Sequence, residues 1–141
     1  MPALFDKFGI KFLYPDDWTL EISTAEDEQG ATVYSRGGGF WSVAIRGGEE
    51  DPADLAKVAL AALGEEYADI DTEPAEETVA EQPLVGYDVN FYCLDLTNTA
   101  QIRACRRNGR TLLMLWQAED REFDEMANVF RAITTSLLYR G

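Results

Sequence analysis

Apolar and polar residues alternate along three consecutive runs late in the chain, which is the pattern of half-buried β-strands. The runs are Leu84–Leu96, Thr99–Arg107 and Arg110–Gln117. Asn108 and Gly109 separate the last two runs, and this dipeptide favours the positive φ angles of a type I′ hairpin turn. We place a second two-residue turn at Thr97-Asn98. The pattern therefore predicts an antiparallel meander of three strands.

The expected register assigns the side chains of this meander to two faces, because successive residues of a strand point to opposite sides. With these turns, Tyr92 lies opposite Arg103, and Arg103 lies opposite Met114. One face is apolar and is expected to belong to the core: Val85, Tyr87, Val89, Phe91, Cys93, Ile102, Ala104, Leu113 and Leu115. The other face is mixed: Tyr92, Leu94, Gln101, Arg103, Cys105, Leu112, Met114 and Trp116.

The mixed face has two interpretations. In the first, a helix or loop partly covers it, and the stem of Arg103 lies over apolar surface while its charge reaches water. In the second, the face is a half-open binding surface, because arginine, methionine and aromatic residues are enriched in interfaces. The candidate contact residues are then Tyr92, Arg103, Met114 and Trp116. Arg103 could stack on an aromatic ring and still bind a carboxylate of a partner.

The remaining segments predict shorter strands and two helices. The strands are Phe8–Tyr14, Trp18–Ser23, Ala31–Arg36 and Phe40–Arg46. Asp51 is a helix N-cap signal, and apolar residues at helical spacing follow it up to Gly64. The last helix begins at Glu119 or Asp120, and its apolar stripe is Phe123, Met126, Ala127, Phe130, Ile133 and Leu137. We predict one α+β domain over residues 1–141, with two main helices on a single antiparallel sheet of about six to eight strands.

Two segments raise the question of a ligand site. Gly37–Gly39 is either a permissive hairpin loop or a place where backbone amides approach an anion, and no helix start follows it to favour phosphate. The stretch Glu65–Glu81 holds eight acidic residues and no basic one. From Asp69 it begins like a calcium loop, but Pro74 and Ala80 stand where that motif requires glycine and glutamate. We interpret it as a solvated acidic edge, with an irregular cation site as the alternative, and predict no metal and no cofactor.

The residue content excludes several kinds of chemistry. The chain has no histidine, which removes catalytic triads and histidine-based zinc sites. Its two cysteines, Cys93 and Cys105, lie on opposite expected faces, so we predict that they are free. Cys105 is either a packed thiol or a reactive one whose pKa the neighbouring arginines lower. We identify no catalytic residue from the sequence.

Charge and hydropathy limit the partners and the compartment. The formal net charge is −14, which argues against nucleic acid and against an anionic membrane surface. No apolar run approaches the roughly 20 residues of a membrane-spanning helix. The first residues do not read as a secretory leader, and free thiols fit a reducing compartment, so we expect a cytoplasmic protein.

Two short motifs near the ends of the chain resemble a known family. They are the Tyr-Pro-x-x-Trp turn within Phe12–Trp18 and the Phe-x-x-Ile-x-x-Ser helix end within Phe130–Leu137. With the order of strands, alanine-rich helix, acidic segment, meander and last helix, they resemble the PsbP-like superfamily, which includes the Ran-binding Mog proteins and bacterial DcrB-like proteins. The resemblance implies an antiparallel sheet with packed helices and a role in binding proteins or assemblies. It transfers no catalytic residue.

These observations lead to two hypotheses of different class. The first is a non-catalytic protein-interaction module, an adaptor or a chaperone for an apolar segment, which binds another protein or a second copy of itself. The second is a small-ligand carrier or an enzyme that uses carboxylates. A deep enclosed pocket with converging polar groups would favour the second, and a shallow apolar groove would favour the first.

Overall fold

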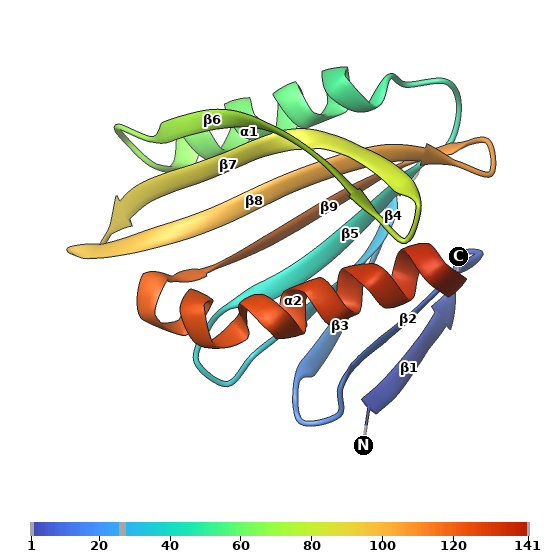
Figure 1. The fold of residues 1–141 in the computed structure, drawn as a ribbon, viewed down its shortest axis with the longest axis horizontal. Coiled ribbons are helices and arrows are strands. Elements are labelled where there is room, and N and C mark those ends of the chain that lie inside the picture. Colours follow the sequence, from blue (N-terminus) through green and yellow to red (C-terminus); the bar gives the residue numbers. More distant parts are fainter. Residues whose placement is uncertain (1, 26–27, 141) are drawn as a thin grey trace.

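The computed structural model describes residues 2–25 and 28–140, which form an antiparallel sheet, a separate hairpin and two helices (Figure 1). The strands are β1 (Pro2–Lys7), β2 (Ile10–Pro15), β3 (Thr19–Thr24), β4 (Gln29–Tyr34), β5 (Phe40–Arg46), β6 (Asp71–Val79), β7 (Gln82–Cys93), β8 (Leu96–Arg107) and β9 (Arg110–Glu119). The helices are α1 (Pro52–Glu66) and α2 (Asp120–Arg140). Seven strands form one sheet in the order β3-β4-β5-β9-β8-β7-β6, and β1 pairs only with β2. The predicted α+β class is confirmed, with this first hairpin as a second, small sheet.

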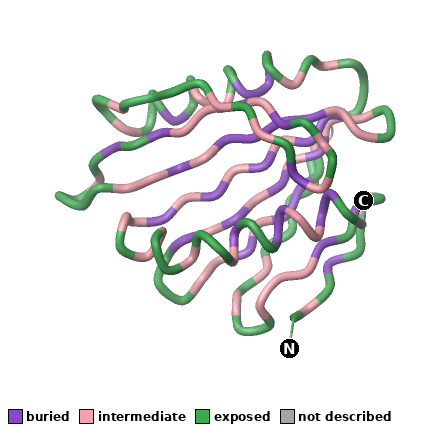
Figure 2. Tube along the Cα trace, viewed as in Figure 1, coloured by how far each residue is buried: buried purple, intermediate pink, exposed green. Residues whose placement is uncertain are grey.

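The two helices pack on opposite faces of the seven-stranded sheet, which buries residues along both faces (Figure 2). On one face, Leu63 of α1 packs with Val89 and Ile102. On the other, Phe130 of α2 packs with Met114 and with the residues of the β1–β2 hairpin. Strands buried on both faces explain why the second face of the meander is only partly polar.

The β7–β8–β9 meander is confirmed, and its two faces are as expected, but one register differs. Asn108-Gly109 forms the β8–β9 turn, and Arg103 lies opposite Met114. The β7–β8 turn, however, is at Leu94-Asp95, so Tyr92 lies opposite Thr97 rather than Arg103. The partner of Tyr92 moves by six residues along β8, and an even shift keeps every side chain on its expected face.

The N-terminal hairpin differs from the prediction of one strand from Phe8. The strands are β1 and β2, and Phe8 and Gly9 form the turn between them, both at positive φ. Phe5 stacks on Phe12 with ring centroids 4.7 Å apart, and Phe12 lies 4.9 Å from the ring of Trp41. The aromatic contacts therefore dock the hairpin on the face that α2 also covers.

The acidic segment, which the sequence indicated as a solvated acidic edge, forms an edge strand of the sheet. β6 runs from Asp71 to Val79 and pairs with β7 along its whole length, with Pro74 opposite Tyr87. A proline and several carboxylates suit an edge strand, because they discourage pairing with another chain. Helix α1, which precedes β6 in the chain, begins where the sequence predicted. The Asp51 carboxylate accepts a hydrogen bond from the amide of Asp54, 3.2 Å away.

Candidate functional site

The four residues of the candidate contact surface do not share an open face. Arg103 is only 4% exposed, and Met114 and Trp116 are buried in the cluster beneath α2. Tyr92 is 69% exposed and lies at the far end of β7, beside the turn. The half-open surface is therefore wrong for three of the four residues, because α2 packs over Met114 and Trp116 and side chains of β6 and β7 enclose Arg103. The interpretation in which a helix partly covers the mixed face is confirmed, but its expectation that the charge of Arg103 reaches water is wrong.

Arg103 reaches two carboxylates inside the protein rather than water. Its Nε donates to Glu77 Oε2 at 2.5 Å and its Nη2 donates to Asp88 Oδ1 at 2.7 Å. Nη1 donates to the carbonyl oxygens of Tyr87 and Ile102 at 3.2 and 3.0 Å. The guanidinium carbon lies 6.0 Å from the ring centroid of Trp116, within cation–π range. The aromatic contact expected from the sequence is present, and the carboxylate partners come from β6 and β7.

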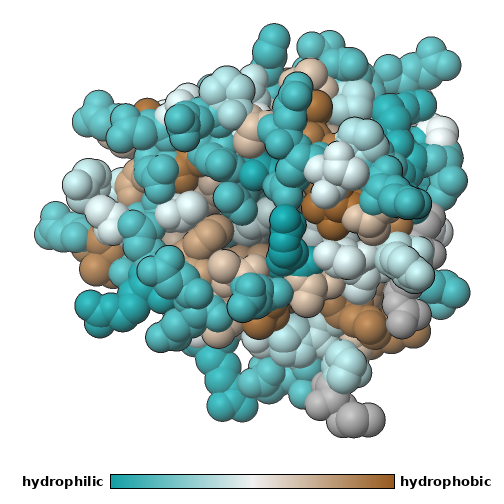
Figure 3. Space-filling view, viewed as in Figure 1, coloured by the Kyte–Doolittle hydropathy of each residue, from teal (hydrophilic) through white to brown (hydrophobic). Residues whose placement is uncertain are grey.

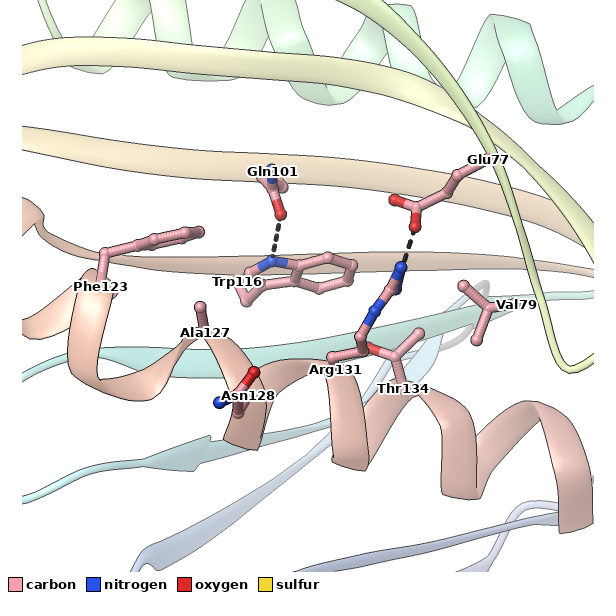
Figure 4. Close-up of a pocket in the computed structure, with 9 residues that line it drawn as sticks. All are labelled: Glu77, Val79, Gln101, Trp116, Phe123, Ala127, Asn128, Arg131 and Thr134. Atoms are coloured by element: carbon pink, nitrogen blue, oxygen red, sulfur yellow. Dashed lines mark hydrogen bonds and ion pairs between the residues drawn. The ribbon is translucent and has the colours of Figure 1, made fainter.

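A small cleft separates the N-terminal half of α2 from β6, β8 and β9 (Figure 4). Its volume is about 310 Å³, and the ring of Trp116 lies between Gln101 and Arg131. Trp116 Nε1 donates to Gln101 Oε1 at 2.8 Å, and Arg131 Nη1 lies 3.2 Å from Glu77 Oε1. Thr134 donates to the carbonyl of Phe130 and accepts from Trp41. Gln101, Glu77, Arg131 and Thr134 thus have partners within the protein, and they do not converge on a position for a reacting atom.

A groove lies on the other side of α2, against β2. Its volume is about 560 Å³. Most of its wall is apolar: Pro2, Leu13, Tyr14, Pro15, Val129, Ala132 and Ile133. Asp16, Asp17, Asn128 and Ser136 complete it. Ser136 Oγ accepts a hydrogen bond from the amide of Leu13 at 2.9 Å, which fixes the β2 edge against the helix. The groove thus joins a preformed apolar surface to an acidic end.

Sequence reasoning did not identify this groove, because its walls come from residues more than a hundred positions apart. Leu13 and Pro15 were assigned to a strand and a turn, and Ile133 to the core stripe of α2. The available signal was that Val129 and Ala132 extend the apolar surface of α2 beyond that stripe. Packing against one sheet buries only a limited apolar stripe of a helix. A wider apolar surface leaves a second side of the helix that needs a contact.

Other candidate chemistries lose support in the structure. Cys105 is buried, and burial raises the pKa of its thiol to about 11 against the smaller lowering effect of Arg107, so both its position and its pKa favour the packed thiol over the reactive one. The space beside Gly37 and Gly39 is occupied by the carboxylate of Glu122, which also binds Ser35 Oγ at 2.9 Å. Within residues 2–25 and 28–140, no cluster of carboxylates and thiols could hold a metal ion. Over the same residues, neither helix combines the length and hydropathy needed to cross a membrane.

Comparison with known proteins identifies the fold. No protein-family model and no curated protein sequence matches the chain. Among solved structures, cyanobacterial PsbP (CyanoP) from Synechocystis sp. PCC 6803 aligns with a TM-score of 0.64 at 14% identity, covering 96% of this chain and 89% of CyanoP. PA94, a Pseudomonas aeruginosa protein of unknown function, aligns with a TM-score of 0.53 at 10% identity, covering 99% and 98% of the two chains.

A third solved structure extends the comparison. LpqN of Mycobacterium tuberculosis, described as involved in cell envelope biogenesis, aligns with a TM-score of 0.50 at 14% identity, covering 94% of this chain and 87% of LpqN. The chain therefore has a PsbP-like fold, as its terminal motifs predicted. The likeness to Mog and DcrB-like proteins stays a prediction.

Proposed function

We propose that this chain is a non-catalytic protein-interaction module, and that the groove between β2 and α2 binds an apolar, positively charged segment of a partner protein. The observation that carries the proposal is the groove itself, which is shallow and has a mostly apolar wall. An apolar groove beside a helix buries side chains of a bound segment without a reaction.

The polar groups of the protein support the same choice. Gln101, Glu77, Arg131 and Thr134 of the α2–sheet cleft have partners within the protein, and the buried thiol of Cys105 resists ionisation. The structural neighbours are cyanobacterial PsbP, a protein involved in cell envelope biogenesis and a protein of unknown function, and none of their descriptions names a reaction. A module that binds without chemistry is consistent with each of these observations.

Charge favours a basic partner. The net charge of −14 attracts a cationic surface and repels both nucleic acid and a second copy of the chain. Asp16 and Asp17 add carboxylates to the lining of the apolar groove, and although Asp17 pairs with Arg36 at 3.6 Å, that pair is exposed and can rearrange around lysine or arginine of a bound segment. Two unpaired cysteines fit a reducing compartment, so we propose that the partner is met in the cytoplasm.

The test compares two exposed alanines on different helices. Ala132→Arg fills the groove and adds a charge that repels a basic segment, whereas Ala61→Arg makes the same change on α1, away from the groove. Both sites are exposed helical positions, where alanine and arginine have similar propensity, so the fold should tolerate either change. Wild type and both variants would be used to capture proteins from the native host, followed by quantitative mass spectrometry.

The proposal expects that wild type and Ala61→Arg capture a basic protein and that Ala132→Arg does not. The same protein, once purified, should bind wild type and Ala61→Arg with similar affinity and Ala132→Arg more weakly. Equal capture by all three baits would contradict the groove as the contact. Sedimentation of the free chain is the second arm: self-association that Ala132→Arg abolishes would replace the basic partner with a second copy.

The cleft of Figure 4 supports a second candidate, a carrier of a small ligand. An indole wall beside Arg131, whose side chain is mostly exposed, suits a flat ligand with an anionic group. Binding there should change the emission of Trp116 and should be lost in Arg131→Gln. Ala132→Arg should leave this signal unchanged, because Ala132 lies in the groove rather than in the cleft.

A further inference from the structure

The hairpin formed by β7 and β8 extends beyond the rest of the sheet. β6 accompanies β7 only as far as Asn90, and β9 accompanies β8 only from Asn98. Residues 92–97 therefore pair only with each other, and Figure 1 shows this end of the hairpin projecting past the neighbouring strands. We refer to Tyr92–Leu96 as the β7–β8 tip. It shares no residue with the groove of the proposed function.

The β7–β8 tip carries an unusual concentration of exposed apolar side chains. Leu94 is 92% exposed, and Tyr92 and Leu96 are exposed beside it. Figure 3 shows hydrophobic side chains gathered at the left edge of the molecule, over this turn. Single exposed apolar residues are ordinary on protein surfaces, but three within one turn form a patch that suits a contact.

The backbone conformation at position 94 is one that a leucine side chain disfavours. Leu94 and Asp95 have φ angles of 52° and 65°, close to the 52° and 76° of Asn108 and Gly109 at the other end of β8. Asn-Gly is the favoured dipeptide for such a turn, and a bulky residue in the left-handed region is strained. The same strand thus has one end with the favoured turn residues and one end without them.

Other loops also hold non-glycine residues at positive φ, namely Phe8, Asp69, Ala80, Glu81 and Asn108, and the two apolar ones gain a packing contact there. Phe8 and Ala80 both pack against the main hydrophobic cluster. Leu94 combines positive φ with nearly complete exposure, so neither turn preference nor packing accounts for it. A contact with another molecule would account for both features, because the apolar side chain would then be buried.

Acidic side chains surround the base of the β7–β8 tip. A hollow of about 240 Å³ there is lined by Asp69, Asp71, Asp120, Asn90, Phe91, Tyr92 and Thr97. Asp95 adds a carboxylate within the turn itself. An exposed apolar side chain with carboxylates around it complements an apolar surface bordered by lysine or arginine. The same carboxylates repel a second copy of this chain, whose net charge is −14.

We propose that the β7–β8 tip is a docking element that packs Leu94 against apolar side chains of a basic segment of a partner protein, with the basic side chains of that segment against the acidic base. The contact is separate from the groove beside α2, and it holds whether or not that groove binds a segment. Side chains from one protruding turn would supply the apolar anchor and the charge, which is how a small interface gains specificity.

The decisive variant replaces the turn residues by a more favourable dipeptide and at the same time removes the exposed leucine side chain. Leu94→Asn with Asp95→Gly installs the dipeptide already used at the other end of β8, so the thermal midpoint should rise rather than fall. Val58→Asn is the matched control, because Val58 is an exposed apolar residue on α1, outside the tip. Tyr92→Ser tests the tip a second time without a change in the turn.

The probe is a short fluorescein-labelled peptide of alternating leucine and lysine, titrated by anisotropy against wild type and each variant. Its leucine–glutamate and serine–lysine counterparts test charge and apolarity separately. We expect the first peptide to bind wild type and Val58→Asn alike, with affinity falling by about tenfold or more in the turn variant, as loss of one buried leucine implies. Added salt should weaken binding.

Three outcomes would overturn the proposal. They are unchanged affinity in the turn variant, equal binding of the leucine–glutamate peptide, and a lower thermal midpoint in the turn variant. The last would show that Leu94 serves the fold. Loss of binding in Ala132→Arg but not in the turn variant would assign the peptide to the groove and refute the tip.

Discussion

Replacing Arg103 by methionine should destabilise the fold, because this arginine is a buried structural ion rather than a contact for a partner. Methionine keeps an unbranched apolar stem beside Trp116 but removes the hydrogen bonds to Glu77, Asp88 and two backbone carbonyls. Gly86 lies opposite Arg103, and a side chain there would collide with the backbone of β8, so the strands cannot easily rearrange around the change.

The magnitude follows from the exposure of the two carboxylates. Removing one partner of a fully buried ion pair costs about 3–5 kcal/mol. Here the side chains of Glu77 and Asp88 remain 26% and 38% exposed, and Glu77 keeps Arg131 at 3.2 Å. Both carboxylates can therefore recover part of their hydration. We expect Arg103→Met to lower the free energy of unfolding by about 2–3 kcal/mol.

The assay is urea unfolding followed by circular dichroism, with Arg36→Met as the matched control. Arg36 forms an exposed pair with Asp17 at 3.6 Å, so its loss should change the free energy of unfolding by at most about 0.5 kcal/mol. Equal, small effects of the two substitutions would refute the buried network. They would restore the open-surface interpretation, in which Arg103 serves binding alone.

Three further expectations concern the core and its chemistry. Phe130→Ala should lower the free energy of unfolding by about 3–5 kcal/mol in chemical denaturation, because its fully buried ring contacts Trp18 and Phe123. A change as small as that of a surface substitution would mean that α2 docks by another face. Gly86→Ala should strongly lower the thermal midpoint, since the added carbon would meet a carbonyl oxygen of β8 at 1.7 Å; an unchanged midpoint would disprove that close approach. Burial raises the pKa of Cys105 from 9.0 to about 11, so the native state holds this proton more tightly and stability should fall between those pH values. Urea unfolding across that range should show a shallower decline in Cys105→Ala, and parallel declines would contradict the shift.

The elements with a strong local signal could be predicted from the sequence. Asn108-Gly109 fixed the β8–β9 turn, and Asp51 marked the start of α1. The β7–β8 turn was misplaced because Thr97-Asn98 resembles a turn and Leu94-Asp95 does not. The actual turn begins with a leucine, which turns do not favour at positive φ, so local propensity could not locate it. The assignment of side chains to the two faces stayed correct, because the register shifted by an even number of residues.

The candidate site was predicted less well, since it depends on packing between distant segments. The sequence placed Trp116 and Arg103 on one face, which is correct, but it could not show that α2 would cover that face. The groove beside α2 combines β2 with a helix from the other end of the chain, and no local pattern encodes that pairing. Tertiary contacts, not strand periodicity, decide which apolar residues remain available to a partner.

The most direct test of the interaction-module proposal is an amide spectrum of isotopically labelled protein, recorded as the purified partner is added. We expect the largest shifts at the walls of the groove, at the amides of Leu13, Val129 and Ala132, with the indole signal of Trp116 nearly unmoved. Shifts confined to Gln101 and Trp116, with the groove amides unchanged, would contradict the proposal and assign binding to the α2–sheet cleft.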